Sequence, residues 1–238
     1  MAFEERILGI LFDSGGVLIR PVGGRWNPRF DFAEILLAHH PQVRVELLPE
    51  AFDAGELLIG SEAESFSRAD YHRAMLRVLG IADPSPELLH ELEAPPARPA
   101  VEPFPETRAV LDQLRASGLP MCVVSDNWAS LEDVYRSLDL HEYFAGFVIS
   151  EVLGCRKPDP RMYAAGSDLL GLPPAVCLFV DDDPELVEAA VELGYQGIAV
   201  TRSGEPPVTV PSIAALTELP PVLRLTSCPP SGNAANHD

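Results

Sequence analysis

The sequence of 238 residues is poor in positive charge. Lys and Arg together number 17, whereas Asp and Glu number 36, which gives a formal net charge of −19. A surface of this sign repels nucleic acids and anionic membranes, so we expect neither as a partner. A phosphorylated substrate would need local positive charge or a metal ion to be held.

Cysteines and long apolar runs are also scarce. The four cysteines form no Cys-x-x-Cys pair, which argues against a zinc site and favours reduced thiols in a cytoplasmic protein; they are Cys122, Cys155, Cys177 and Cys228. His39 and His40 have the position of a helix end and are not expected to bind zinc. No apolar run reaches the roughly 20 residues of a membrane span, and we expect no signal peptide ahead of the first strand.

The most informative stretch is an apolar run, Ile7 to Phe12, that ends in Asp13. The run has the length of a buried strand, and Gly15 and Gly16 allow a sharp turn after it. Ligands of open α/β sheets bind at the carboxyl ends of the strands. Asp13 is therefore a candidate nucleophile or metal ligand, with a turn or helix-cap aspartate as the alternative.

The chain divides into a core and an insertion. Residues from about 27 to 93 have the spacing of helices only, with proline and glycine signals on both sides. We expect a core from residues 1–20 and 98–225, an α-helical cap from 21–97 and a disordered tail from 226–238. An insertion just after the first strand is placed to cover the strand end; a helical subdomain with no part in the site is the alternative.

The second half alternates short apolar runs with helical segments, which is the pattern of a parallel α/β sheet. Gly and Pro signals mark the helix ends, as at Gly118 and at the pair Asp159-Pro160. The expected strands are 121–124, 147–149, 177–180 and 197–200, and the expected helices are 107–116, 131–138, 160–170 and 184–193.

Polar side chains follow these strands where each one ends. They are Ser125, Asp126 and Asn127 after one strand, Lys157 in a later loop, and Asp181, Asp182 and Asp183 after the next strand. Together with Asp13 they provide carboxylates, a hydroxyl and an ammonium for one crevice, a set that suits phosphoryl transfer with Mg²⁺. Three adjacent acids are costly to hold together unless a cation screens them. Each residue taken singly also has a purely structural interpretation. Ser125 would cap a helix, Lys157 would be a surface turn residue, and the three acids would form an N-cap cluster.

Four motifs resemble those of the haloacid dehalogenase-like (HAD) hydrolase superfamily, over nearly the whole chain to about residue 203. They are Phe12-Asp13-Ser14-Gly15-Gly16-Val17-Leu18, Val124-Ser125-Asp126-Asn127, Arg156-Lys157-Pro158-Asp159-Pro160 and Phe179-Val180-Asp181-Asp182-Asp183-Pro184. The resemblance implies a Rossmann-like parallel-sheet α/β core with an inserted α-helical cap of the small C1 type. It also implies Mg²⁺-dependent chemistry through an aspartyl-enzyme intermediate.

The same resemblance implies a role for each site residue. Asp13 would be the nucleophile, and Lys157 would steady it and bind the transferring phosphoryl group. The implied substrate-binding set is Ser125, Asp126, Asn127 and Lys157. The implied metal ligands are Asp13, the backbone carbonyl of Gly15 and, as the main ligand of the fourth motif, Asp182. Asp181 would be a further ligand or would support the ligands from beside them.

One position departs from the family pattern. Most phosphatases of the family carry an aspartate two residues after the nucleophile, as general acid for the leaving group, and this chain has Gly15 there. The dehalogenase branch also lacks this aspartate but works without metal, which the acids at 181–183 argue against. We therefore expect a Mg²⁺-dependent phosphatase of a small phosphorylated metabolite. The alternatives are a 2-haloacid dehalogenase-type hydrolase and a catalytically weak pseudoenzyme that binds a phosphate ligand.

Substrate choice is expected to lie with the cap and its entrance. Arg25, Trp26 and Arg29 follow the first strand and are candidates to line the pocket. Arg25 or Arg29 would meet a second anionic group and Trp26 would stack on a ring; surface arginines and a packed tryptophan are the alternative. The sequence indicates neither the substrate nor the oligomeric state.

Overall fold

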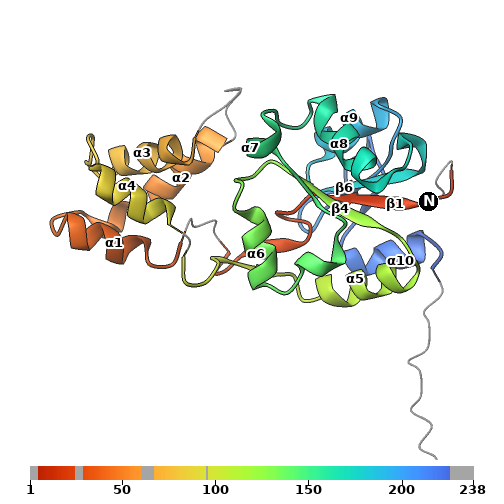
Figure 1. Ribbon diagram of the computed structural model, residues 1–238, viewed down its shortest axis with the longest axis horizontal. Coiled ribbons are helices and arrows are strands. Elements are labelled where there is room, and N and C mark those ends of the chain that lie inside the picture. Colours follow the sequence, from red (N-terminus) through yellow and green to blue (C-terminus); the bar gives the residue numbers. More distant parts are fainter. Residues whose placement is uncertain (1–4, 25–28, 60–66, 95, 226–238) are drawn as a thin grey trace, which may run out of the picture.

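The computed structural model describes residues 5–24, 29–59, 67–94 and 96–225 (Figure 1). The tail 226–238, for which the sequence predicts disorder, lies outside these residues, as does Cys228. The described chain forms an α/β unit and a helical unit that lie beside each other (Figure 1). The predicted fold class, a Rossmann-like parallel sheet with a helical insertion, is confirmed.

Six parallel strands form the central sheet, in the order β5-β4-β1-β6-β7-β8. Their bounds are β1 (Gly9–Phe12), β4 (Met121–Ser125), β5 (Phe147–Ile149), β6 (Cys177–Asp181), β7 (Gln196–Val200) and β8 (Ser212–Ile213). All of β1 is buried between β4 and β6, which explains why its sequence is continuously apolar. The strand order changes direction at β1, and ligands of open α/β sheets bind at such a switch point.

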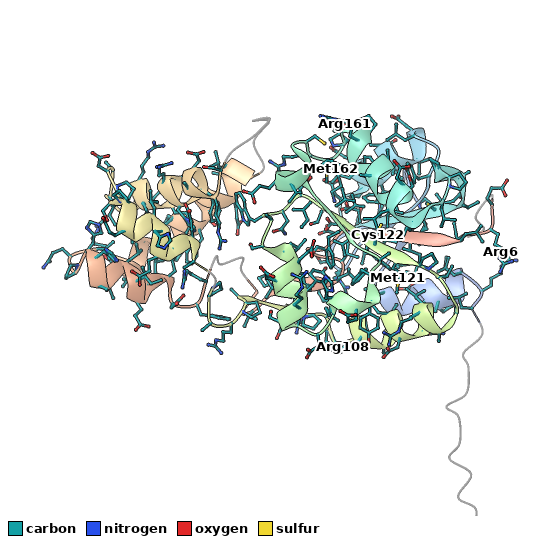
Figure 2. All side chains as sticks on the ribbon, in the orientation of Figure 1. Arg6, Arg108, Met121, Cys122, Arg161 and Met162 are labelled. Atoms are coloured by element: carbon teal, nitrogen blue, oxygen red, sulfur yellow. The ribbon has the colours of Figure 1, made fainter. Side chains whose placement is uncertain are left out.

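Helices cover both faces of the sheet (Figure 1). Helices α5, α6 and α10 pack on one face, and α8 and α9 pack on the other. Met121 and Cys122 are neighbours on β4 and belong to opposite faces of the sheet (Figure 2). The Cys122 thiol donates a hydrogen bond to the Gly166 carbonyl of α8 at 3.4 Å. The bounds are α5 (Thr107–Ala116), α6 (Leu131–Ser137), α7 (Ser150–Leu153), α8 (Pro160–Leu170), α9 (Pro184–Glu192) and α10 (Leu219–Val222), with short 3-10 turns η2 (His141–Tyr143), η3 (Pro174–Val176) and η4 (Leu216–Glu218).

Local signals set the ends of several elements. Asp159 accepts a hydrogen bond from the backbone of Arg161 at 2.9 Å, and Pro160 takes the first position of α8. The predicted bounds of α5, β5 and α8 are confirmed. The cysteines of the described residues, Cys122, Cys155 and Cys177, are buried free thiols, as predicted.

The helical unit has a hydrophobic core of its own. It contains α1 (Phe32–His39), η1 (Val45–Leu47), α2 (Leu48–Ile59), α3 (Arg68–Val78) and α4 (Pro86–Glu93). The helices bury their apolar faces against one another, with Phe32, Leu36, Met75, Leu76, Leu88 and Leu92 at the centre. Each helix among the described residues is too short or too polar to cross a membrane.

Two short strands that the sequence analysis missed join the two units. β2 (Ile19–Pro21) and β3 (Val101–Pro103) pair in antiparallel fashion close to the two boundaries expected between core and cap. Arg20 and Glu102 form an ion pair across them at 2.8 Å. Each strand is three residues long and ends in proline, which lacks the backbone donor of a sheet residue, so neither has a recognisable strand pattern. The sequence analysis also missed β8, because a strand of two residues has no recognisable pattern.

Candidate active site

Asp13 lies one residue beyond β1, at the carboxyl edge of the sheet. Its backbone N–H donates to the Val180 carbonyl of β6 at 2.8 Å, so the residue is held beside the end of that strand. Only 8% of Asp13 is exposed. The helical unit lies beyond this edge of the sheet (Figure 1).

Lys157 joins two of the predicted site carboxylates. Its ammonium Nζ is 2.7 Å from Oδ1 of Asp13 and 2.6 Å from Oδ2 of Asp181, and all three side chains are buried. The other Asp181 oxygen, Oδ1, accepts the backbone N–H of Asp183 at 2.9 Å. The structure thus brings together Asp13, Lys157 and Asp181 as the sequence predicts, although three different segments carry them.

Burial and charge set the proton affinities of these groups. Burial raises the pKa of Asp13 to about 7, because the opposing effect of Lys157 does not fully offset it and Asp181 adds to it. Burial would lower the pKa of Lys157, but the carboxylates of Asp13 and Asp181 outweigh it and raise that pKa above its ordinary value. Lys157 therefore stays protonated, while Asp13 holds a proton more strongly than an ordinary aspartate does.

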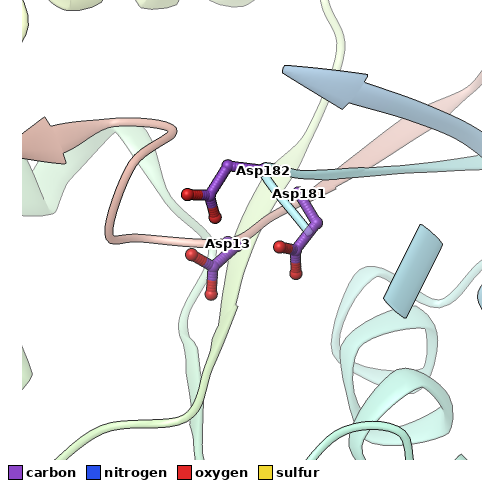
Figure 3. Close-up of side chains that lie close together, drawn as sticks. All are labelled: Asp13, Asp181 and Asp182. Atoms are coloured by element: carbon purple, nitrogen blue, oxygen red, sulfur yellow. The ribbon is translucent and has the colours of Figure 1, made fainter. Parts of the chain in front are cut away.

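Asp182 completes the acidic group. Its carboxylate lies beside those of Asp13 and Asp181 (Figure 3), and the three supply ligand atoms within 4.8 Å of one another. Partial burial of the carboxyl and the neighbouring charge of Asp181 raise the pKa of Asp182 to about 6. Asp183, by contrast, caps α9 by accepting the backbone N–H of Glu185 at 2.9 Å. Of the three successive acids, two belong to the site and one to the helix.

The chemistry of this donor set fits a divalent cation. Three carboxylates share one edge of the sheet, and Lys157 is the ammonium that pairs with two of them. Mg²⁺ takes carboxylate oxygens and retains several waters, so three carboxylates at a partly open site are suitable ligands. Burial first, and then the charge of Asp181, raise the pKa values of Asp13 and Asp182, and a bound cation would oppose both effects.

The turn after Asp13 is shaped by Gly16. Gly16 has φ of 73°, and a Cβ atom added there would lie 2.0 Å from Oδ2 of Asp182. Glycine is needed for both reasons, since a side chain would be strained and would displace that carboxylate. The left-handed backbone conformation in this turn belongs to Gly16 and not to Gly15, which lies between it and Ser14.

Ser125 closes β4 next to the acidic group. It is 2% exposed, and no described residue makes a hydrogen bond to its hydroxyl. Asp126 uses Oδ1 to accept the backbone N–H of Lys157 at 3.1 Å, so it holds the lysine loop in place. The backbone N–H of Asn127 donates instead to Oγ of Ser150, at the start of α7, at 3.0 Å. The predicted phosphate-binding segment thus contains an available hydroxyl and two residues that position loops.

Arg202 is a site-supporting residue that the sequence analysis missed. Its guanidinium donates to the carbonyls of Gly16 and Val17, each at 2.8 Å, and pairs with Glu106 at 2.6 Å. It also stacks on Phe104, 3.4 Å from the ring centroid. No motif marks this arginine; the one available signal is that it follows a core strand, β7, by two residues.

The three residues predicted to line the entrance have different outcomes. Arg25 and Trp26 lie outside the described residues. Arg29 is buried in the helical unit, where it pairs with Asp31 and donates to the carbonyls of Glu91, Leu92 and Ala94 at the end of α4. The Arg29 guanidinium therefore stabilises the helical unit. These contacts do not support the predicted role of binding a second anionic group of the substrate.

The six-stranded parallel sheet, its switch point and the buried contacts of Lys157 with Asp13 and Asp181 agree with the fold that the four motifs imply. The family model of the haloacid dehalogenase-like hydrolases matches residues 7–194. The chain therefore belongs to that family, as the four motifs indicate.

Curated relatives include enzymes with two kinds of name. A phosphatase of Mycobacterium tuberculosis is 34% identical over 104 residues, which are 43% of this chain and 48% of that protein. Haloacetate dehalogenase H-2 of Moraxella is 28% identical over 128 residues, 50% of this chain and 57% of that protein. The chain thus spans about half the length of the curated relatives it matches.

Solved structures resemble the whole described fold. A HAD phosphatase from Thermococcus onnurineus matches with a TM-score of 0.63 at 19% identity. The match covers 92% of this chain and 99% of the phosphatase chain. The L-2-haloacid dehalogenase from Xanthobacter autotrophicus has a TM-score of 0.67 at 18% identity, with 93% and 100% covered. These likenesses establish the fold alone.

Proposed function

We propose that this protein is a Mg²⁺-dependent phosphatase that hydrolyses a small phosphorylated metabolite through a phosphorylated Asp13. The observation that carries the proposal is the convergence of Asp13, Asp181 and Asp182, with ligand atoms within 4.8 Å of one another. These carboxylates and the carbonyl of Gly15 would hold the cation. Bound Mg²⁺ would neutralise phosphoryl oxygens and draw the group toward the nucleophile.

Asp13 would act as the nucleophile. An oxygen of its carboxylate bonds to phosphorus while the bond to the leaving-group oxygen breaks, and the electron pair leaves with that oxygen. Lys157, 2.7 Å from Oδ1, holds the carboxylate in place and favours its ionised form. Water then hydrolyses the acyl phosphate, which releases inorganic phosphate and restores Asp13.

Ser125 would bind the transferring group. Its hydroxyl ends β4 at the same edge of the sheet as Asp13, and no described residue occupies it. A hydroxyl donor and the ammonium of Lys157 are suited to phosphoryl oxygens. Asp126 and Asn127 would support this site by fixing the loops on either side of it.

The helical unit would serve as a cap over the site. It lies beyond the carboxyl edge of the sheet (Figure 1). Trp128 of the β4 loop packs against its core. A cap in this place excludes water from the acyl phosphate and selects the leaving group. Because Gly15 supplies no general acid, aryl and acyl phosphates, whose leaving groups need little protonation, are the favoured class.

A 2-haloacid dehalogenase is the second candidate. Two observations favour it: Gly15 stands where most family phosphatases have an acid, and several matched relatives are named as dehalogenases. In that reaction Asp13 would displace halide from carbon and form an ester. The three converging carboxylates have no evident use there, which is why the phosphatase is preferred.

Parallel assays separate the candidates. The proposal predicts that p-nitrophenyl phosphate is hydrolysed with Mg²⁺ and that chelation abolishes the activity. Chloride release from 2-chloropropionate without metal would instead establish the dehalogenase. A protein that binds inorganic phosphate yet turns over neither substrate would be the pseudoenzyme.

A further inference from the structure

Arg68, at the first position of α3, has no hydrogen-bonded or ion-paired partner among the residues that the structure describes. The nearest acid on the helix, Asp70, completes a capping box with Ser67 and pairs with Arg73 at 3.2 Å. Within the described part of the chain, the Arg68 guanidinium is therefore available to an anion from outside the protein.

The position of Arg68 is electrostatically unfavourable. The amino end of a helix carries partial positive charge, so a cation there is destabilising. Burial lowers the pKa of the guanidinium below its ordinary value, and the nearby charge of Arg29 adds to this, against the attraction of Glu93. An anionic partner at Arg68 would relieve all of these effects.

Arg68 lies on the same side of α3 as Tyr71, because residues three apart on a helix are neighbours. Tyr71, three residues further along α3, has its ring centroid 5.8 Å from that of Trp128, which follows Asn127 in the β4 loop. Arg68 also feels the charge of Glu151 in α7 of the α/β unit. The Glu151 carboxylate is engaged, because it accepts the backbone N–H of Ala129 at 2.6 Å.

We propose that Arg68 binds a second anionic group of the substrate, a carboxylate or a further phosphate, at the junction between α3 and the β4 loop. This inference rests on the proposed function, since it requires the reacting phosphoryl group to lie at Asp13 at the same time. A guanidinium suits such a group because it donates two parallel hydrogen bonds to a planar or tetrahedral anion. The substrate class is therefore a small phosphate ester or acyl phosphate with a second negative charge remote from the reacting phosphorus.

Matched aryl phosphates test the inference. Phenyl phosphates with a meta or para carboxylate are compared with the neutral carboxamides, as kcat/KM with Mg²⁺. We expect wild type to prefer a carboxylate by at least about tenfold, and Arg68→Gln to lose that preference. Arg73→Gln is the control: it removes one positive charge from an exposed position of the same helix and should keep the preference for the carboxylate. Thermal melts of each variant confirm that it is folded.

A binding measurement separates this inference from the phosphatase proposal. Calorimetry with the corresponding carboxy- and carbamoyl-phenylphosphonates needs no turnover. If no aryl phosphate is hydrolysed but the carboxylate preference in binding exists and disappears in Arg68→Gln, the inference stands and the proposed reaction fails. The inference is overturned if wild type hydrolyses both series without a preference. It is also overturned if Arg68→Gln weakens both series equally, which is the result expected of an arginine that only supports the structure.

Discussion

Arg202 donates a hydrogen bond at 2.8 Å to the backbone carbonyl of Gly16, 186 residues earlier in the chain. Gly16 in turn leaves the space that the Asp182 carboxylate occupies. The arginine side chain is therefore linked, through one glycine, to the geometry of the acidic site. Its contacts with Val17 and Glu106 fix the same turn from a second side.

Arg202→Gln should loosen this turn. Three hydrogen bonds of the guanidinium are lost and Glu106 is left partly buried without its partner, so we expect the free energy of unfolding to fall by roughly 2–3 kcal/mol. Mg²⁺ affinity, measured by calorimetry, should fall as well. Arg161→Gln breaks an exposed pair with Asp159 and should change stability much less than Arg202→Gln does. Unchanged Mg²⁺ affinity in a destabilised Arg202→Gln would limit the arginine to a structural role.

Mg²⁺ should stabilise the protein through the acidic site. A ligand that binds only the folded state at 100 times its Kd adds about 2.7 kcal/mol to the free energy of unfolding. We expect Mg²⁺ to raise the melting temperature of wild type, and Asp182→Asn to remove most of this rise. Asp183→Asn is the matched control, because Asp183 caps α9 and does not face the site. Equal shifts in wild type and Asp182→Asn would place the cation elsewhere.

The same shift should depend on pH. The pKa values of Asp13 and Asp182 are raised from 3.8 to about 7 and about 6, so the metal-free folded state binds protons that the unfolded chain has already released. The stability contribution of these groups is thus present at low pH and is lost as pH rises through 4 to 7. Because protons compete with Mg²⁺, we expect a larger Mg²⁺-induced rise in melting temperature at about pH 8 than at about pH 5.5.

His72 of α3 should limit the acid stability of the helical unit. It is fully buried, neither ring nitrogen has a partner among the described residues, and burial with the charges of Arg68 and Arg29 lowers its pKa from 6.5 to about 3. The unfolded chain takes up a proton below pH 6.5 that the folded chain refuses, so stability is lost as pH falls. His72→Leu should be more stable by roughly 1 kcal/mol at neutral pH, with a gap that widens toward acid.

Denaturant unfolding from neutral to acid pH checks this expectation. His40→Gln, at the end of α1 and outside the core, removes a histidine without removing a buried ring and should follow wild type. A constant difference between His72→Leu and wild type at every pH would show that His72 does not titrate on unfolding.

Much of the fold could be predicted because its signals are local. The bounds of α8 follow from the Asp159-Pro160 pair, and β1 follows from its apolar run. The site carboxylates could be predicted because parallel strands end at one edge. The β2–β3 pair could not, since three-residue strands ending in proline have no pattern of their own. Arg29 and Arg202 act through long side chains on backbone carbonyls, which no spacing in the sequence reveals.

Gly15→Asp should restore a general acid. The strained backbone position of the turn is Gly16, with φ of 73°, so an aspartate at position 15 meets no left-handed conformation. A positioned acid contributes roughly 10²–10⁴-fold, mainly for poor leaving groups. We expect the ratio of kcat on an alkyl phosphate to kcat on p-nitrophenyl phosphate to rise by at least about tenfold. Gly15→Asn, which has the same size and no acid, should leave the ratio near that of wild type.

The most direct test of the account is to find the covalent intermediate. Wild type is mixed with p-nitrophenyl phosphate and Mg²⁺, quenched in acid, digested and analysed by mass spectrometry. We predict one added phosphoryl group on Asp13, and neither the added group nor turnover in Asp13→Asn. A phosphoryl group on another residue, or Asp13→Asn that hydrolyses the substrate as fast as wild type, would contradict the account.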